Sequence, residues 1–113
     1  MKIEDILLPG EQILLKGKDF LHNYCLTTDR IISYHSSGAE FSFCCYNGAD
    51  ASISLKYGTK SVIVKTAGNQ LTLEFTNAKD HPAADELFAL LSKCITAAHR
   101  GERYIPSQGK ETV

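Results

Sequence analysis

The sequence lacks both an excess of one charge and any long apolar run. Its 13 acidic residues nearly balance 12 Lys and Arg, which leaves a net charge of -1. The chain as a whole therefore does not attract nucleic acid, and we expect no nucleic-acid partner. No segment approaches the roughly 20 apolar residues of a membrane-spanning helix, and "MKIEDILLPGEQ" contains no apolar signal-peptide core. These absences predict a cytoplasmic protein without a transmembrane segment.

The motifs of common catalytic and metal sites are also missing. The chain contains no G-x-S-x-G, no glycine-rich phosphate-binding loop and no CxxC pair, and its four histidines are scattered. His35 and Cys25 could approach each other from neighbouring strands, but they lack the ligand spacing of a zinc site. We therefore expect neither an enzyme nor a metal or other cofactor.

Composition is that of one ordinary globular domain. Of the 113 residues, 43% are hydrophobic and 22% are charged, which is enough for one core without disulfides. We place this domain at residues 1–101 and expect a flexible C-terminal tail at residues 102–113, where only Tyr104 and Ile105 could dock. We expect the irregularly spaced cysteines to be reduced and mostly buried: Cys25, Cys44, Cys45 and Cys94.

Turn residues recur at nearly even intervals of about ten, a spacing typical of short antiparallel strands joined by tight turns. Within "CLTTDRIISYH", this spacing favours a hairpin bend at Thr28-Asp29 over a reactive polar cluster. Asp29 and Arg30 would then form at most an exposed ion pair, worth about 0–1 kcal/mol. The predicted strands are Glu11 to Lys18, His22 to Thr27, Arg30 to Ser36, Glu40 to Tyr46, Ala51 to Tyr57, Ser61 to Thr66 and Gln70 to Thr76.

Several of these segments alternate between apolar and polar residues, as half-buried strands do: "SISLKY" and "QLTLEF" are examples. In "EFSFCCY", the alternation places Phe41, Phe43 and Cys45 on one face and Ser42, Cys44 and Tyr46 on the other. We take the face with the two phenylalanines as the buried one, which predicts Cys45 as a core residue.

After Thr76 the apolar period changes to that of a helix. Asp80 and Pro82 mark its start, and His99-Arg100-Gly101 provide a basic last turn and a stop. The predicted buried face comprises Ala84, Leu87, Phe88, Leu91, Cys94, Ile95 and Ala98. The fold class is therefore mainly β (α+β), a strongly bent sheet or partly open barrel packed against one C-terminal amphipathic helix.

Three short motifs carry a family resemblance over about Leu7 to His99. Gly10-Glu11 precedes the first strand, Leu26-Thr27 ends the second, and Arg30-Ile31-Ile32 begins the third. Together with the terminal helix they resemble the bacterial pleckstrin-homology-like (PH-like) domains. The resemblance implies a seven-stranded antiparallel PH-like fold. Where such domains have a proline-containing "IPY..I" stretch after the third strand, this chain has "FSFCCYNGADASI".

The resemblance further implies a noncatalytic platform for proteins or lipids, and some relatives self-assemble. An open sheet has exposed edges that can pair with a peptide strand or with a second copy. We therefore expect a protein partner or a homo-oligomer. The apolar leader residues Ile3, Ile6, Leu7 and Leu8 would either cover their own sheet or bind a neighbour.

The alternative function is binding of anionic lipid headgroups through Lys16, Lys18, Lys56 and Lys60. Phosphoinositide-binding PH-like domains carry basic residues around the first hairpin, but here Asp19 follows Lys18 and no arginine is near, so we do not assign such a site. Lys56 and Lys60 flank the predicted Gly58-Thr59 turn, and their convergence with Lys65 depends on the strand register. If these three lysines do not converge, they are solvent-exposed residues of an ordinary hairpin.

Overall fold

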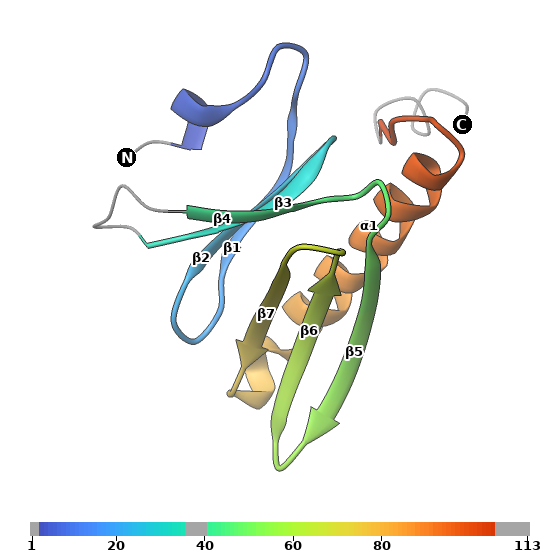
Figure 1. The fold of residues 1–113 in the computed structure, drawn as a ribbon. Helices are drawn as coiled ribbons and strands as arrows, with labels where there is room; N and C mark the ends of the chain where they lie inside the picture. The colour runs from blue at the N-terminus through green and yellow to red at the C-terminus, as the bar shows by residue number, and fades with distance from the viewer. Residues whose placement is uncertain (1–2, 36–40, 106–113) are drawn as a thin grey trace, which may run out of the picture.

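A computed structural model describes residues 3–35 and 41–105 and has the predicted α+β class (Figure 1). All seven expected strands are present with small shifts at their ends, and one long helix follows them. The strands are β1 (Ile13–Lys18), β2 (Asn23–Thr27), β3 (Arg30–Tyr34), β4 (Phe41–Cys45), β5 (Asp50–Lys56), β6 (Thr59–Lys65) and β7 (Gln70–Phe75). The helices are two 3₁₀ turns, η1 (Ile3–Ile6) and η2 (Ala78–Asp80), and the α-helix α1 (His81–His99).

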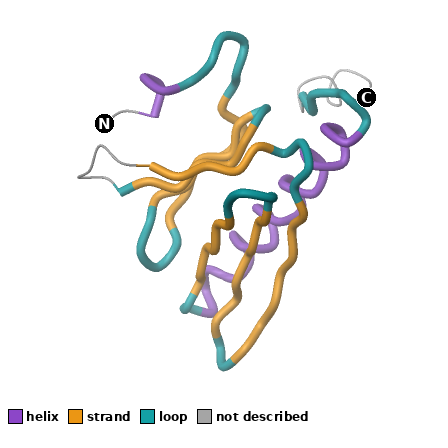
Figure 2. The backbone as a smooth tube through the Cα atoms, viewed as in Figure 1, coloured by secondary structure: helices purple, strands orange, loops and turns teal. Residues whose placement is uncertain are grey.

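The strands form two antiparallel sheets. The N-terminal sheet has the order β1-β2-β3-β4 and the C-terminal sheet the order β5-β6-β7, so each sheet is a simple meander. The two sheets run across one another, and α1 lies behind the C-terminal sheet (Figure 2). Within the described residues, no helix combines the length and hydropathy needed to cross a bilayer.

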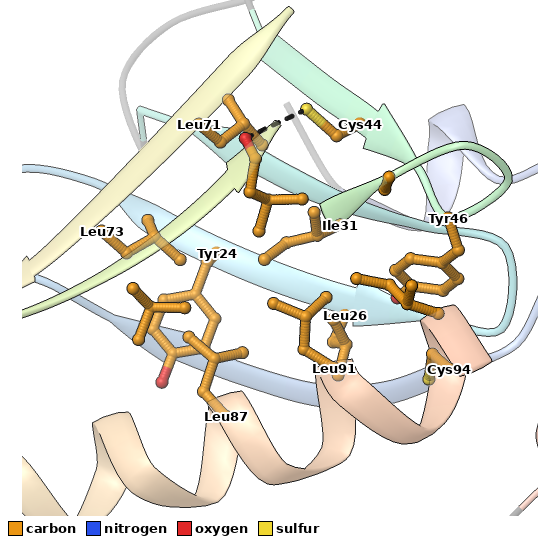
Figure 3. Close-up of a cluster of buried hydrophobic side chains, with 14 of the residues drawn as sticks. Tyr24, Leu26, Ile31, Cys44, Tyr46, Leu71, Leu73, Leu87, Leu91 and Cys94 are labelled. Carbon is orange, nitrogen blue, oxygen red and sulfur yellow. Dashed lines mark hydrogen bonds between the residues drawn. The ribbon is translucent and has the colours of Figure 1, made fainter. Parts of the chain in front are cut away.

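The main core lies between one face of each sheet and the helix (Figure 3). Leu26 and Ile31 enter it from the N-terminal sheet, Val62 and Leu73 from the C-terminal sheet, and Leu91 from α1, and all are fully or almost fully buried. Full burial of an aliphatic side chain of this size contributes about 1.5–3 kcal/mol. These contacts therefore hold the sheets and the helix together.

The opposite face of the N-terminal sheet is partly covered by the chain's own leader. Ile3 packs with Cys25 and Ile32, and Ile6 joins this smaller cluster. Of the two roles expected for the leader, covering its own sheet is the one observed for these residues. Leu8 remains 53% exposed.

The face assigned to β4 from the sequence is wrong. Cys44 is buried, whereas Cys45 and both flanking phenylalanines are exposed. The register explains the inversion, because Cys44 lies opposite Ile31 in the core, whereas Cys45 lies opposite Arg30. Phe43 instead packs against the guanidinium group of Arg30, 4.7 Å from its ring centroid.

The β5–β6 hairpin turns at Tyr57-Gly58, one residue earlier than predicted. Both residues have positive φ, 51° and 80°, as the turn of a two-residue hairpin requires. Lys56 and Thr59 are consequently the closing pair. The hairpin is fastened to the start of α1, because His81 Nε2 lies 3.1 Å from the Gly58 carbonyl oxygen and Lys60 pairs with Asp85 at 2.6 Å.

Helix α1 ends where the sequence predicts, at His99, and Gly101 adopts φ 74° just beyond it. The residues that follow, 102–105, lie against the body, with Tyr104 packed on the main core. The first part of the predicted tail is therefore docked. The remainder of that prediction, residues 106–113, lies outside the described residues.

Gly17 on β1 leaves room for the buried ring of Tyr24, the residue opposite it. A Cβ at position 17 would collide with the Tyr24 hydroxyl group and ring, whereas one at Gly68 would meet open space. We expect Gly17→Ala to lower the free energy of unfolding by about 1–3 kcal/mol, and Gly68→Ala to change it by less than about 0.5 kcal/mol. Urea unfolding of both variants measures the difference, and equal stability would contradict the close packing.

Candidate functional site

The motif residues at the β2–β3 hairpin and before β1 meet in one buried polar cluster. Arg30 Nε lies 3.0 Å from Glu11 Oε2, and Arg30 Nη2 donates to Glu11 Oε1 at 3.2 Å and to the Ile6 carbonyl at 2.7 Å. The side chains of Glu11 and Arg30 are only 0% and 6% exposed. Arg30 therefore pairs with Glu11 and not with Asp29, the partner that the sequence left open.

Thr27 connects this ion pair to the β2–β3 turn. Its hydroxyl group donates to Glu11 and accepts hydrogen bonds from the amides of Asp29 and Arg30. The buried Tyr46 hydroxyl group reaches the carbonyl oxygens of Thr27 and Arg30, at 2.7 and 2.9 Å. The backbone amides of Thr28, Asp29 and Arg30 thus have partners within the fold, and the pairing of β2 with β3 confirms that Thr28-Asp29 is a hairpin bend.

The chain's C-terminal part closes the same turn from outside. Arg103 Nε lies 2.8 Å from Asp29 Oδ1, and its Nη2 donates to Oδ2 at 3.0 Å. This is a two-point contact between a guanidinium and a carboxylate group, which is more directional than a single surface ion pair. Sequence reasoning missed it, because nothing in the local sequence of Asp29 points to a residue so far along the chain.

The hydrogen bonds and the pKa of Glu11 indicate that this cluster stabilises the fold. Burial by itself would raise the pKa of Glu11, but hydrogen bonds from Arg30, Thr27 and the Leu8 amide outweigh it and lower the pKa below its ordinary value of 4.5. Glu11 therefore stays ionised at neutral pH, with its lone pairs occupied. A carboxylate held in this way is poorly suited to accept a proton from a substrate.

Replacing Glu11 by Gln should leave the Arg30 charge buried without its counter-charge. We expect Glu11→Gln to lower the free energy of unfolding by about 3–5 kcal/mol at pH 7. Because the folded-state pKa lies below 4.5, the contribution of the pair is present above pH 4.5 and is lost as the pH falls through the folded-state pKa. Denaturant titrations from pH 7 to pH 3 should show the two proteins converging in stability at the acid end. A constant difference would contradict the assignment.

All four cysteines are free thiols, and three of them are buried. Burial raises the pKa of Cys25 and of Cys94 to about 11 and also raises that of Cys44. Their thiolate populations at neutral pH are therefore small, which disfavours nucleophilic chemistry. No group of three or more potential metal-ligating side chains occurs in the part of the chain that the structure describes.

The exposed thiol of Cys45 should react alone. In the native protein at pH 8, a thiol reagent such as 5,5′-dithiobis(2-nitrobenzoic acid) should modify about one cysteine per chain rapidly, because the other three are shielded and protonated. Cys45→Ser should remove this fast phase, and unfolding should expose all four thiols of the wild type. Rapid reaction of a second cysteine would contradict the burial pattern.

The four lysines proposed for lipid binding do not share one surface. Lys16 and Lys18 lie on β1 in the N-terminal sheet, and Lys16 pairs with Glu4 at 3.1 Å. Lys56 and Lys60 lie in the other sheet, and their register with Thr59 and Leu55 directs them to opposite faces. Lys60 is on the helix side, where it binds Asp85. The register therefore separates the lysines that the sequence left open to convergence.

An open cleft of about 650 Å³ lies where β3 and β4 approach β7, and sequence reasoning missed it. His22 and His35 flank the pair of Asn23 and Tyr34 at the end of the β2–β3 ladder and meet there with ring centroids 4.8 Å apart. Asp19 lies beside His22, with Oδ1 3.6 Å from Nδ1. However, the Asp19 carboxylate already accepts hydrogen bonds from the amides of His22 and Glu74, so it serves to hold the β1–β2 turn against β7.

Strand β5 forms one edge of the C-terminal sheet (Figure 1). It is seven residues long and pairs with β6 without a bulge. Leu55, near its end, is 59% exposed, and Tyr57 in the following turn is fully exposed. Within residues 3–35 and 41–105, no hydrogen bond reaches the side of β5 that faces away from β6.

These surfaces and clusters have to be interpreted from their own chemistry, because no protein-family model, no curated protein and no solved structure matches the chain.

Proposed function

We propose that this chain is a noncatalytic PH-like module of the cytoplasm that binds a protein partner or its own copies. The observation that carries the proposal is the open edge of β5, whose unpaired backbone groups can accept a further strand. The free thiols are in keeping with a reducing compartment. The α+β architecture, with two meander sheets and a C-terminal helix, is compatible with the PH-like resemblance.

The residues that carry the PH-like resemblance support a noncatalytic binding role, because they are bonded to one another inside the fold. Glu11, Thr27 and Arg30 carry much of the resemblance, and all three are buried and bonded to one another. They stabilise the scaffold and leave its outer surface to make the contacts. Lipid binding through lysines has weaker support, because Lys16 and Lys60 already have acidic partners and the four lysines are divided between two sheets.

A charge on the β5 edge should weaken association. We expect Leu55→Lys to lower self-association, or the binding of a captured protein partner, by about tenfold, because a lysine on an edge strand opposes the approach of another strand. Leu8→Lys is the matched control, since Leu8 is 53% exposed on a different surface. Sedimentation velocity and affinity capture followed by binding measurements give the comparison, with circular dichroism as the check on folding.

Three outcomes are distinguishable. Loss of association in Leu55→Lys but not in Leu8→Lys supports the proposal. A protein that stays a 12.4 kDa monomer and binds no partner reproducibly contradicts it. Salt-sensitive binding to anionic vesicles that is lost when Lys16 and Lys18 are reversed to Glu would favour the lipid function instead.

A further inference from the structure

The hairpin geometry determines which backbone groups of β5 are unpaired. In a hairpin with a two-residue turn, the closing residues, here Lys56 and Thr59, form a hydrogen-bonded pair, and such pairs then alternate along the ladder. Backbone groups of the even-numbered residues therefore point to β6, and those of Ala51, Ile53 and Leu55 point outward. These three residues present a row of donors and acceptors at the correct spacing for another antiparallel strand.

The other edge strands are less open. On β7, Glu74 exchanges backbone and side-chain hydrogen bonds with Asp19 and Phe20. On β4, the Phe43 carbonyl accepts a hydrogen bond from the Asn69 side chain. Strand β1 carries Lys16, Lys18 and a register irregularity near Ile13, and lysines and bulges are the usual devices that prevent edge pairing. Strand β5 has none of these along its centre.

We infer that β5 is a homodimer interface in which it pairs with β5 of a second copy, antiparallel about a twofold axis at Ile53. The inference rests on the proposed assembly function and names the surface that performs it. This register overlaps all three outward residues, so that Ile53 faces its own copy and Ala51 faces Leu55. It forms about six backbone hydrogen bonds and joins two three-stranded sheets into one.

The side chains of β5 are complementary in this register. Asp50 of each copy lies opposite Lys56 of the other, which gives two symmetry-related pairs of opposite charge at the two ends of the interface. Both side chains are exposed, and neither takes part in an ion pair among the described residues. The half-exposed Leu55 lies opposite the small side chain of Ala51, so the large and small residues alternate across the seam.

Contacts within the same molecule fix the position of β5 before any pairing takes place. Contacts of Lys60 with Asp85 and of Gly58 with His81 fix the hairpin to α1. Because β5 does not have to become ordered upon association, little conformational entropy opposes the pairing. Ser52 and Ser54 lie on the solvent face of the seam, and their small side chains leave room for the second copy.

Charge reversal with rescue tests the register directly. Asp50→Lys alone places two lysines at each end of the seam, and Lys56→Asp alone places two aspartates there, so each should raise the dimer dissociation constant by at least about tenfold. The double variant Asp50→Lys/Lys56→Asp restores both pairs and should recover most of the wild-type affinity. Lys79→Asp, on the exposed η2 turn, makes the same change in net charge as Lys56→Asp and is its control.

Sedimentation equilibrium of the full chain from about 1 to 500 µM provides the readout. The wild type should move from the monomer mass of 12.4 kDa toward twice that value. Equal association of the wild type and both single variants would overturn the β5 register while leaving assembly itself intact. A wild type that stays monomeric would overturn the dimer, and the proposed function would then depend on a captured protein partner whose binding Leu55→Lys weakens.

Discussion

The ion pair between Glu11 and Arg30 joins the segment before β1 to the β2–β3 turn inside the fold. Arg30 opens β3, Glu11 belongs to the segment before β1, and their pairing draws the leader across the back of the N-terminal sheet. Thr27 and Tyr46 bind the same turn from inside, and Arg103 binds it from the C-terminal end. A buried charge pair is costly to desolvate, so its contribution depends on these additional hydrogen bonds being made.

This arrangement explains why a polar stretch between two apolar strands forms a hairpin bend whose side chains bind one another. An active site needs groups whose lone pairs or protons are available to a substrate. In the cluster around Thr27 those groups are already engaged with one another, and the shift in the Glu11 pKa maintains the charge that the pairing uses. The buried thiols show the opposite pKa shift. Burial raises the pKa of Cys25 and of Cys94 and keeps both thiols neutral.

The polar groups of the Glu11–Arg30 cluster bind one another. The groups that remain accessible to a partner therefore lie at the edges and on the outer faces of the sheets. The edges are unequal, because three carry side chains or neighbouring segments that obstruct pairing, whereas β5 is continuous and uncovered in the described structure. Its two charged residues, Asp50 and Lys56, stand at opposite ends of the strand. A strand that is complementary to its own reversed copy favours association of like with like over aggregation along many edges.

The sequence by itself determined the elements. Turn residues at regular intervals predicted the seven strands, and the apolar period after Thr76 predicted α1, because both are local properties of the backbone. The faces and partners were decided only in the tertiary structure. Cys44 rather than Cys45 is buried because β4 takes its register from β3, and Lys56 and Lys60 diverge because Lys60 pairs with Leu55, whose side chain lies on the face opposite that of Lys56. The contact of Arg103 with Asp29 joins segments that are far apart in the sequence. Such a contact depends on how the residues after α1 pack against the β2–β3 turn, which no local pattern of residues records.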